Sequence, residues 1–115
     1  MNRKRISARF YRNKNQTEPV RDWLLSLEKH DRTEIGNDIK TVEYGWPVGM
    51  PICRSLGKGL WEVRTDLTHG RIARILFCFH DEALVLLHGF IKKSQKAPKS
   101  DLELANKRKK EVENG

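Results

Sequence analysis

The sequence predicts an α+β domain in which an antiparallel sheet carries an N-terminal pair of helices and a C-terminal helix. Three features predict this fold: helical apolar spacing in the first half, alternating residues in the second half, and a last apolar stripe before the C-terminus. With 115 residues, the chain suits a single domain, residues 1–115, built around one modest core.

A short strand and two helices are expected in the first half. Apolar and polar residues alternate from Ile6 to Tyr11, as in a strand with one buried face. Apolar residues then recur at helical spacing from Val20 to Leu27, after Thr17 as the expected N-cap. A second helix is expected to begin at Asp31 and to end near Gly45. We expect the helices to gather on one face of the sheet.

The second half predicts a meander of strands followed by a helix. Residues alternate from Trp61 to Leu67, and the connection Thr68-His69-Gly70 suits a hairpin loop. Two strongly apolar strands follow, at Ile72–Phe79 and Leu84–Leu87. Short turns between consecutive strands predict antiparallel pairing. The last helix is expected to begin at a capping box that starts with Ser100.

The charge of the chain predicts a polyanionic partner. Lys and Arg number 23 against 15 Asp and Glu, which gives a net charge of +8. Nucleic acid is the first candidate, an acidic protein the second and an anionic membrane surface the third. No apolar run approaches the ~20 residues of a membrane span, and no signal peptide is evident, so we expect a cytoplasmic protein. Cys53 and Cys78 are too few for a disulfide scaffold or a four-cysteine zinc site, so no metal is expected.

Two arginines are the strongest candidates for a binding site. The three-residue connection sets a register in which Arg64 lies opposite Arg74, and such a like-charge pair costs some tenths of a kcal/mol up to about 1. One interpretation is a phosphate clamp, because the planar guanidinium fork matches phosphate oxygens. The other is a pair of side chains splayed to solvent, with Glu62 on the same face as counter-ion. The pattern leaves both open.

A second register extends this surface to the last strand. A two-residue turn at Asp81-Glu82 places Gly89 near Arg74, with Lys93 on the same face and Lys92 as the alternative. Gly89 would leave space for a ligand backbone, or it is an ordinary strand glycine.

Two ring-bearing residues lie near this surface. Trp61 is on the opposite alternation from Arg64, which favours a core position over base stacking. His88 is predicted to point away from Arg74, toward the side of Ile75. That placement favours a satisfied buried histidine over a general base.

Several spaced motifs in this order resemble the HigB branch of the RelE/ParE toxin superfamily. They are Leu60-Trp61-Glu62-Val63-Arg64, Arg71-Ile72-Ala73-Arg74-Ile75-Leu76-Phe77, Leu87-His88-Gly89-Phe90-Ile91-Lys92-Lys93, and a Pro before a helix with Ala105 and Arg108. The resemblance covers most of the chain. It implies the toxin of a type II toxin–antitoxin pair, with a RelE-like fold of helices packed on an antiparallel sheet.

The resemblance also implies an activity and partners. RelE and HigB members are endoribonucleases that cut messenger RNA in the ribosomal A site, here without metal or other cofactor. The expected partners are the ribosome with its mRNA and a cognate helix-turn-helix antitoxin, which would carry the DNA-binding surface of the complex. Two alternatives remain open: a ParE-like gyrase-inhibiting toxin, and a basic nucleic-acid-binding module without chemistry.

The motifs carry over three catalytic candidates. Arg64 matches a basic residue that lines the cleft, Arg74 matches the arginine that holds the scissile phosphate, and Lys93 matches the basic residue at the end of the last strand. Further RNA-binding candidates are Lys58, Glu62, Lys92 and Lys96. The chain departs from the pattern in having Glu62 where many members have a basic residue. It has no tyrosine after Tyr44, which excludes a C-terminal tyrosine acid or base.

Overall fold

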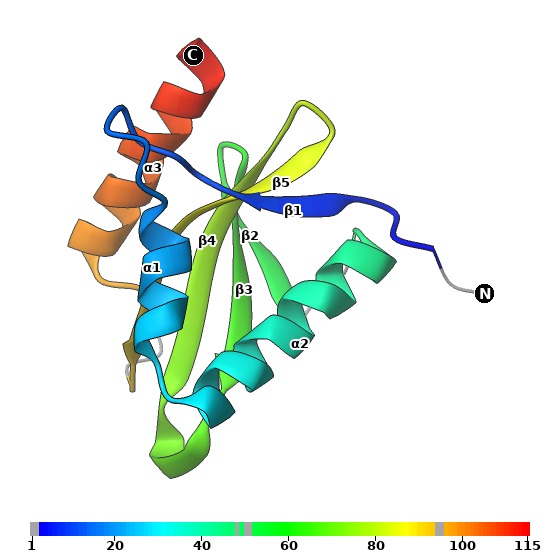
Figure 1. The fold of residues 1–115 in the computed structure, drawn as a ribbon, viewed down its shortest axis with the longest axis vertical. Helices are drawn as coiled ribbons and strands as arrows, with labels where there is room; N and C mark the ends of the chain where they lie inside the picture. Colours follow the sequence, from blue (N-terminus) through cyan, green and yellow to red (C-terminus); the bar gives the residue numbers. More distant parts are fainter. Residues whose placement is uncertain (1–2, 48, 50–51, 94–95) are drawn as a thin grey trace.

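The computed structural model describes residues 3–47, 49, 52–93 and 96–115. Its centre is a five-stranded sheet in the order β1–β5–β4–β3–β2, and helices pack on it (Figure 1). Along the chain the elements are β1 (Ser7–Phe10), α1 (Pro19–Ser26), α2 (Lys29–Gly45), β2 (Cys53–Gly57), β3 (Leu60–Asp66), the short 3-10 turn η1 (Thr68–Gly70), β4 (Ile72–His80), β5 (Ala83–Lys92) and α3 (Lys99–Asn114). The predicted α+β class is confirmed.

The helices cover both faces of the sheet, so the expectation of a single helical face is wrong. On one face, α1 and α2 pack on alternate residues of β4 such as Ile75 and Phe77. On the other face, Ala105 of α3 packs with Leu76 and Cys78. Successive strand residues point to opposite faces, and β4 is apolar at both sets of positions, so the sheet needs cover on both sides.

The sheet is antiparallel except at β1, which runs parallel to β5. The expectation of a wholly antiparallel sheet therefore holds for the strands that short turns link. β1 and β5 pair in parallel, and the long chain segment between them forms the crossover connection. β1 pairs with β5 only as far as Leu86, whose carbonyl accepts a hydrogen bond from the Tyr11 N–H at 2.9 Å. At the next residue, the Arg108 guanidinium of α3 donates to the Leu87 carbonyl at 2.9 Å. Arg108 thus supplies a hydrogen bond to the edge of β5 at the point where β1 no longer pairs with it.

The helices begin without the predicted side-chain caps. The residue before α1 is Glu18, not Thr17, and α2 begins at Lys29, two residues before Asp31. Before α3 stands Pro98, and Ser100 lies inside the helix. None of the three helices has a side-chain hydrogen bond at its N-cap. The fixed φ of Pro19 at the start of α1 is preorganised for a helix, which explains a start there without a cap.

The β3–β4 register is the predicted one. Arg64 lies directly opposite Arg74. The connection folds as η1 and is closed by a hydrogen bond from the Leu67 N–H to the Arg71 carbonyl at 2.9 Å. The three-residue loop was therefore sufficient to set this register.

The β4–β5 register differs from the prediction by one residue. The turn at Asp81-Glu82 has two residues, as expected, and both have positive φ, at 50° and 59°. A β-bulge then inserts Leu87: Phe77 pairs with Leu86, whereas Leu76 pairs with His88. Beyond the bulge, every residue of β5 faces the opposite side from the one predicted.

Candidate functional site

Charged side chains from three adjacent strands meet on the face of the sheet that α3 partly covers. Arg54 of β2 pairs with Glu62 of β3, and two residues further along β3 Arg64 pairs with Arg74 of β4. Because alternate residues share a face, all four lie on the same face as Leu76. We call Arg54, Glu62, Arg64 and Arg74 the arginine cluster.

The centre of the arginine cluster is buried. Both Glu62 and Arg74 are 0% exposed. The Glu62 carboxylate lies between two guanidinium groups, with Oε1 3.5 Å from Arg54 Nε and Oε2 3.8 Å from Arg74 Nε. Within the described part of the chain, neither carboxylate oxygen accepts a hydrogen bond. One carboxylate against three guanidinium groups leaves the cluster positively charged.

The pKa of Arg74 reflects this environment. Burial lowers the pKa of Arg74 below its ordinary value; Glu62 opposes that shift, while Arg64 and Arg54 lower the pKa further. Arginine remains protonated at neutral pH in proteins, so Arg74 is a buried cation. Its guanidinium carbon lies 6.0 Å from the ring centroid of Phe90, at the limit of a cation–π contact.

Solvent reaches the arginine cluster from β2 and β3. The Arg54 side chain is 37% exposed, and Arg64 is half-buried. The Arg64 N–H donates to the Ile52 carbonyl at 2.8 Å, which ties this part of β3 to the chain leading into β2. Arg54 and Arg64 are therefore the members of the cluster that an external anion can approach, whereas Arg74 lies behind them.

The bulge changes which lysine belongs to this face. Lys92 pairs with Ile72 and so shares the face of Arg74, whereas Lys93 lies just after the end of β5. The register from which Lys93 was expected to share the face of Arg74 is wrong, and the pairing brings Lys92, the alternative, to that face. Both lysines are exposed.

The remaining lysine candidates lie apart from one another. Lys58 occupies the β2–β3 turn, just before β3 begins at Leu60. Leu60 itself is four residues, or about 13 Å, from Arg64 along the strand. Lys96 is exposed in the connection between β5 and α3. Of the predicted residues, the structure thus brings Glu62, Arg64, Arg74 and Lys92 to one face, while Lys58 is at the far end of β3.

Gly89 serves close helix packing. It pairs with Ile75 and faces α1, where a Cβ atom would lie 2.5 Å from Cζ3 of Trp23. The predicted proximity of Gly89 to Arg74, with room for a ligand, is therefore wrong. Trp61 packs against the core beside Trp46 at a ring-centroid distance of 5.0 Å, which confirms its predicted core position.

His88 faces the side opposite to the one predicted. It pairs with Leu76, and its ring stacks on Phe90 at 5.6 Å, next to Arg74. The imidazole Nε2 lies 2.6 Å from Oδ1 of Asp101 in the first turn of α3. His88 thus has a polar partner, as predicted for a satisfied buried histidine, but the bulge turns its ring toward the arginine cluster.

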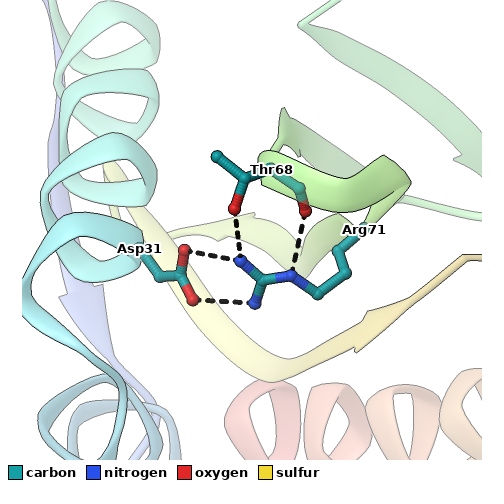
Figure 2. Close-up of polar contacts among 3 residues, drawn as sticks. All are labelled: Asp31, Thr68 and Arg71. Atoms are coloured by element: carbon teal, nitrogen blue, oxygen red, sulfur yellow. Dashed lines mark hydrogen bonds and ion pairs between the residues drawn. The ribbon is translucent and has the colours of Figure 1, made fainter.

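A second arginine–carboxylate pair lies at the β3–β4 connection (Figure 2). Arg71 donates from Nη1 to Oδ2 of Asp31 at 2.8 Å and from Nη2 to Oδ1 at 3.0 Å. It also donates to the Thr68 carbonyl and hydroxyl, each at 3.0 Å. The hydrogen bonds from Arg71 lower the pKa of Asp31 below its ordinary value of 3.8. This ion pair links η1 to the first turn of α2.

Comparison with protein families identifies the fold family. Residues 22–110 match the model of the phage-derived Gp49-like protein family (DUF891). The chain is a Gp49-like protein. That family belongs to the RelE/ParE-like toxin clan, so the predicted superfamily is confirmed, and membership implies an antitoxin as partner. Among the curated proteins, no match is found.

Several features of this Gp49-like protein bear on its chemistry. Burial raises the pKa values of Cys53 and Cys78 to about 11, so both thiols are protonated at neutral pH. Across residues 3–47, 49, 52–93 and 96–115, no three His, Cys, Asp or Glu side chains gather as metal ligands would. In those same ranges, no helix combines the length and apolar character of a membrane span.

Sequence reasoning missed two members of these sites. Arg54 was missed because β2 was not recognised as a strand. A regular hairpin extended back from the β2–β3 turn would have placed Arg54 opposite Val63, and only the irregularity between Ser55 and Gly57 brings it opposite Glu62. Asp31 was expected to cap a helix, and nothing local in the sequence indicates its pairing with Arg71, 40 positions away.

Proposed function

We propose that this Gp49-like protein is a HigB-type toxin of a type II toxin–antitoxin pair that cleaves messenger RNA on the ribosome in the cytoplasm. The observation that carries the proposal is the placement of Arg64 directly opposite Arg74 in a cluster with excess positive charge. Two arginines in that register repel each other, and an anionic ligand relieves the repulsion. Membership of the toxin clan supports the same conclusion.

The proposed reaction is an in-line transfer within RNA. The ribose 2′-oxygen attacks the adjacent phosphorus, the bond from phosphorus to the 5′-oxygen breaks, and the proton lost from the 2′-hydroxyl is balanced by one gained on the leaving oxygen. The products are a 2′,3′-cyclic phosphate and a 5′-hydroxyl. Negative charge builds on the phosphate oxygens in the transition state, where fixed cationic donors stabilise it most.

The arginines take different parts in this proposal. Arg64 contacts the phosphate directly, because it is half-buried and lies directly opposite Arg74. Lys92 extends the positive face along the RNA, and Lys93 and Lys96 continue it beyond β5. Arg74, which is buried, adds to the positive electrostatic potential at Arg64. It contacts the phosphate itself if RNA binding opens the cluster.

Positioning supplies the rest of the rate acceleration in this proposal. Arginine cannot act as a base at neutral pH. His88 places an imidazole on this face, and its contact with Asp101 fixes the orientation of the ring. Because the ribosome itself orients the message, correct alignment of the 2′-oxygen provides a large share of the barrier reduction.

The decisive experiment is cleavage of a defined message in a reconstituted translation reaction, with 5′-end mapping. Arg64→Gln should lower the cleavage rate about 10²–10³-fold, the cost of losing one donor to the transition-state oxyanion. Arg21→Gln, which removes an exposed charge from α1 on the other face, should leave cleavage intact. If the purified protein leaves ribosome-bound message uncut, the proposed activity is wrong.

The same preparation separates the alternatives. A ParE-like toxin would block gyrase supercoiling and leave translation unaffected. A non-catalytic binding module would bind RNA with a steep salt dependence and leave both reactions unaffected. Either pattern would replace the nuclease proposal.

A further inference from the structure

Arg54 belongs to none of the motifs that suggested the family, yet it forms the solvent side of the arginine cluster. It lies on β2, the edge strand of the sheet, opposite Glu62. Its Nε is buried, and the side chain as a whole is 37% exposed. No hydrogen bond to the described residues occupies its two terminal nitrogens. The guanidinium is therefore held at its base and available at its tip.

Glu62 is the group that holds it. The 3.5 Å contact joins the carboxylate to Arg54 Nε, the edge of the guanidinium nearest the main chain. Because the fork of arginine presents donors on more than one edge, a contact at Nε leaves the terminal pair to bind a second anion. Glu62 is fully buried and cannot move toward solvent without disturbing β3. The carboxylate that interrupts the family's basic pattern therefore has a defined use, which is to fix Arg54.

The register also relates Arg54 to Arg64. Arg54 pairs with Glu62, and Arg64 is two residues further along β3, so the two arginines are diagonal neighbours on one face. Such neighbours are about 7–8 Å apart, a distance that long side chains span. Both reach solvent, unlike Arg74. Two guanidinium tips at this spacing can hold one phosphate between them or contact successive phosphates of a strand.

We propose that Arg54 is a phosphate-binding residue of the RNA face, oriented by Glu62 and acting together with Arg64. The choice of RNA as ligand rests on the proposed function; the anion-binding role of Arg54 rests on the exposed tip, the buried contact to Glu62 and the diagonal register. The opposing interpretation is that Arg54 neutralises Glu62 and does nothing else. The two interpretations differ in what happens when both charges are removed together.

The experiment measures binding of a short single-stranded RNA with 2′-O-methyl ribose, which cannot be cleaved, to the full-length protein over a series of KCl concentrations. Arg54→Gln should weaken binding about tenfold, as expected for a lost hydrogen bond to a charged group. It should also reduce the slope of log K against log salt by about 0.7, one phosphate contact to a single strand. Arg21→Gln removes the same charge on the other face and should change neither quantity.

The double variant Arg54→Gln/Glu62→Gln decides between the interpretations. Its net charge equals that of the wild type, but Arg74 loses its carboxylate neighbour, so folding is checked by urea unfolding and RNA binding is compared per folded molecule. A contact role predicts that the double variant still binds weakly and keeps the reduced slope. Wild-type binding and wild-type slope in the double variant would overturn the proposal.

Failure of this inference can be told apart from failure of the proposed function. If messages are cleaved but RNA binding ignores Arg54, the toxin proposal stands and the role of Arg54 is wrong. If no message is cleaved but RNA binding depends on Arg54 in both variants, the phosphate site stands and the nuclease proposal is wrong.

Discussion

Two arginines of strand β4 and its preceding loop, three positions apart, pair with carboxylates in opposite ways. Arg71 makes a forked, hydrogen-bonded contact with Asp31 at 2.8 and 3.0 Å, near the surface. Arg74 and Glu62 are both fully buried and lie 3.8 Å apart, in a cluster that holds more positive charge than negative. The first pair satisfies both partners and joins two elements. The second retains excess positive charge in the interior, which is costly for folding and useful for holding an anion.

The largest expected effect comes from breaking the buried pair. Arg74→Met should destabilise the protein by about 3–5 kcal/mol in urea unfolding, because Glu62 remains buried without its neighbour. It should also abolish message cleavage. Arg74→Met/Glu62→Leu should recover most of the stability, since apolar replacement of a buried pair is often neutral, and should remain inactive. Recovery of cleavage in the double variant would show that the buried charges are structural alone.

Breaking the part-buried Arg71–Asp31 pair should have a smaller effect on stability and none on the site. Asp31→Asn keeps the size of the side chain and removes the charge that Arg71 contacts, so the melting temperature should fall by less than in Arg74→Met. Cleavage per folded molecule should equal that of the wild type. If Asp31→Asn inactivates the folded protein, then η1 contributes to the site and is not a structural connection alone.

The Arg71–Asp31 pair should also make the stability of the protein depend on pH. Because the folded-state pKa of Asp31 is lowered, its contribution to stability is fully present above the unfolded-state value near 3.8 and is lost as pH falls toward the folded-state pKa. The difference in unfolding free energy between wild type and Asp31→Asn should therefore be constant from pH 5 to 7 and shrink below about pH 4. A difference that persists undiminished in acid would contradict the charged contact.

The smallest effects concern single lysines at the two ends of the charged face. Lys92→Gln should weaken binding of the uncleavable RNA and lower its salt slope, because Lys92 shares the face of Arg74. Lys58→Gln should weaken binding less, because Lys58 lies in the turn before Leu60, and Leu60 is already about 13 Å along β3 from Arg64, beyond the ~10 Å screening length at moderate salt. Titration of both variants under identical salt conditions makes the comparison. Equal losses would extend the RNA path over the whole length of β3.

Local patterns in the sequence were sufficient for most elements and for one register. The alternation around Arg64 and the short loop before Arg71 fixed the β3–β4 pairing, because hairpin geometry is decided within a few residues. The family motifs indicated the toxin superfamily for the same reason: they follow these strands in order. The placement of Arg64 opposite Arg74 could thus be predicted from the sequence alone.

Features that depend on distant contacts could not be predicted. The bulge at Leu87 has no sequence signature of its own, and it reversed the predicted directions of His88 and Gly89. The burial of Arg74 arises from neighbours on β2 and β5. The expectation of a single helical face failed because helices cover both faces of β4 and β5. Each error concerns which face of the sheet a side chain or helix lies on, because the two faces look alike in the sequence and packing decides between them.

The inserted residue in β5 decides which side chains belong to the basic face. If β5 followed β4 without the bulge, Gly89 would come opposite Arg74, the imidazole of His88 would turn into the layer beneath α1, and Lys92 would leave the face of Arg74. Deleting Leu87 itself would remove the bulge and keep His88 opposite Leu76 and Gly89 opposite Ile75. A slip of one residue in the pairing, with no residue altered, would thus dismantle the basic face at unchanged composition and net charge. In this chain, counting residues from the turn without locating the bulge assigns the wrong lysine to the face.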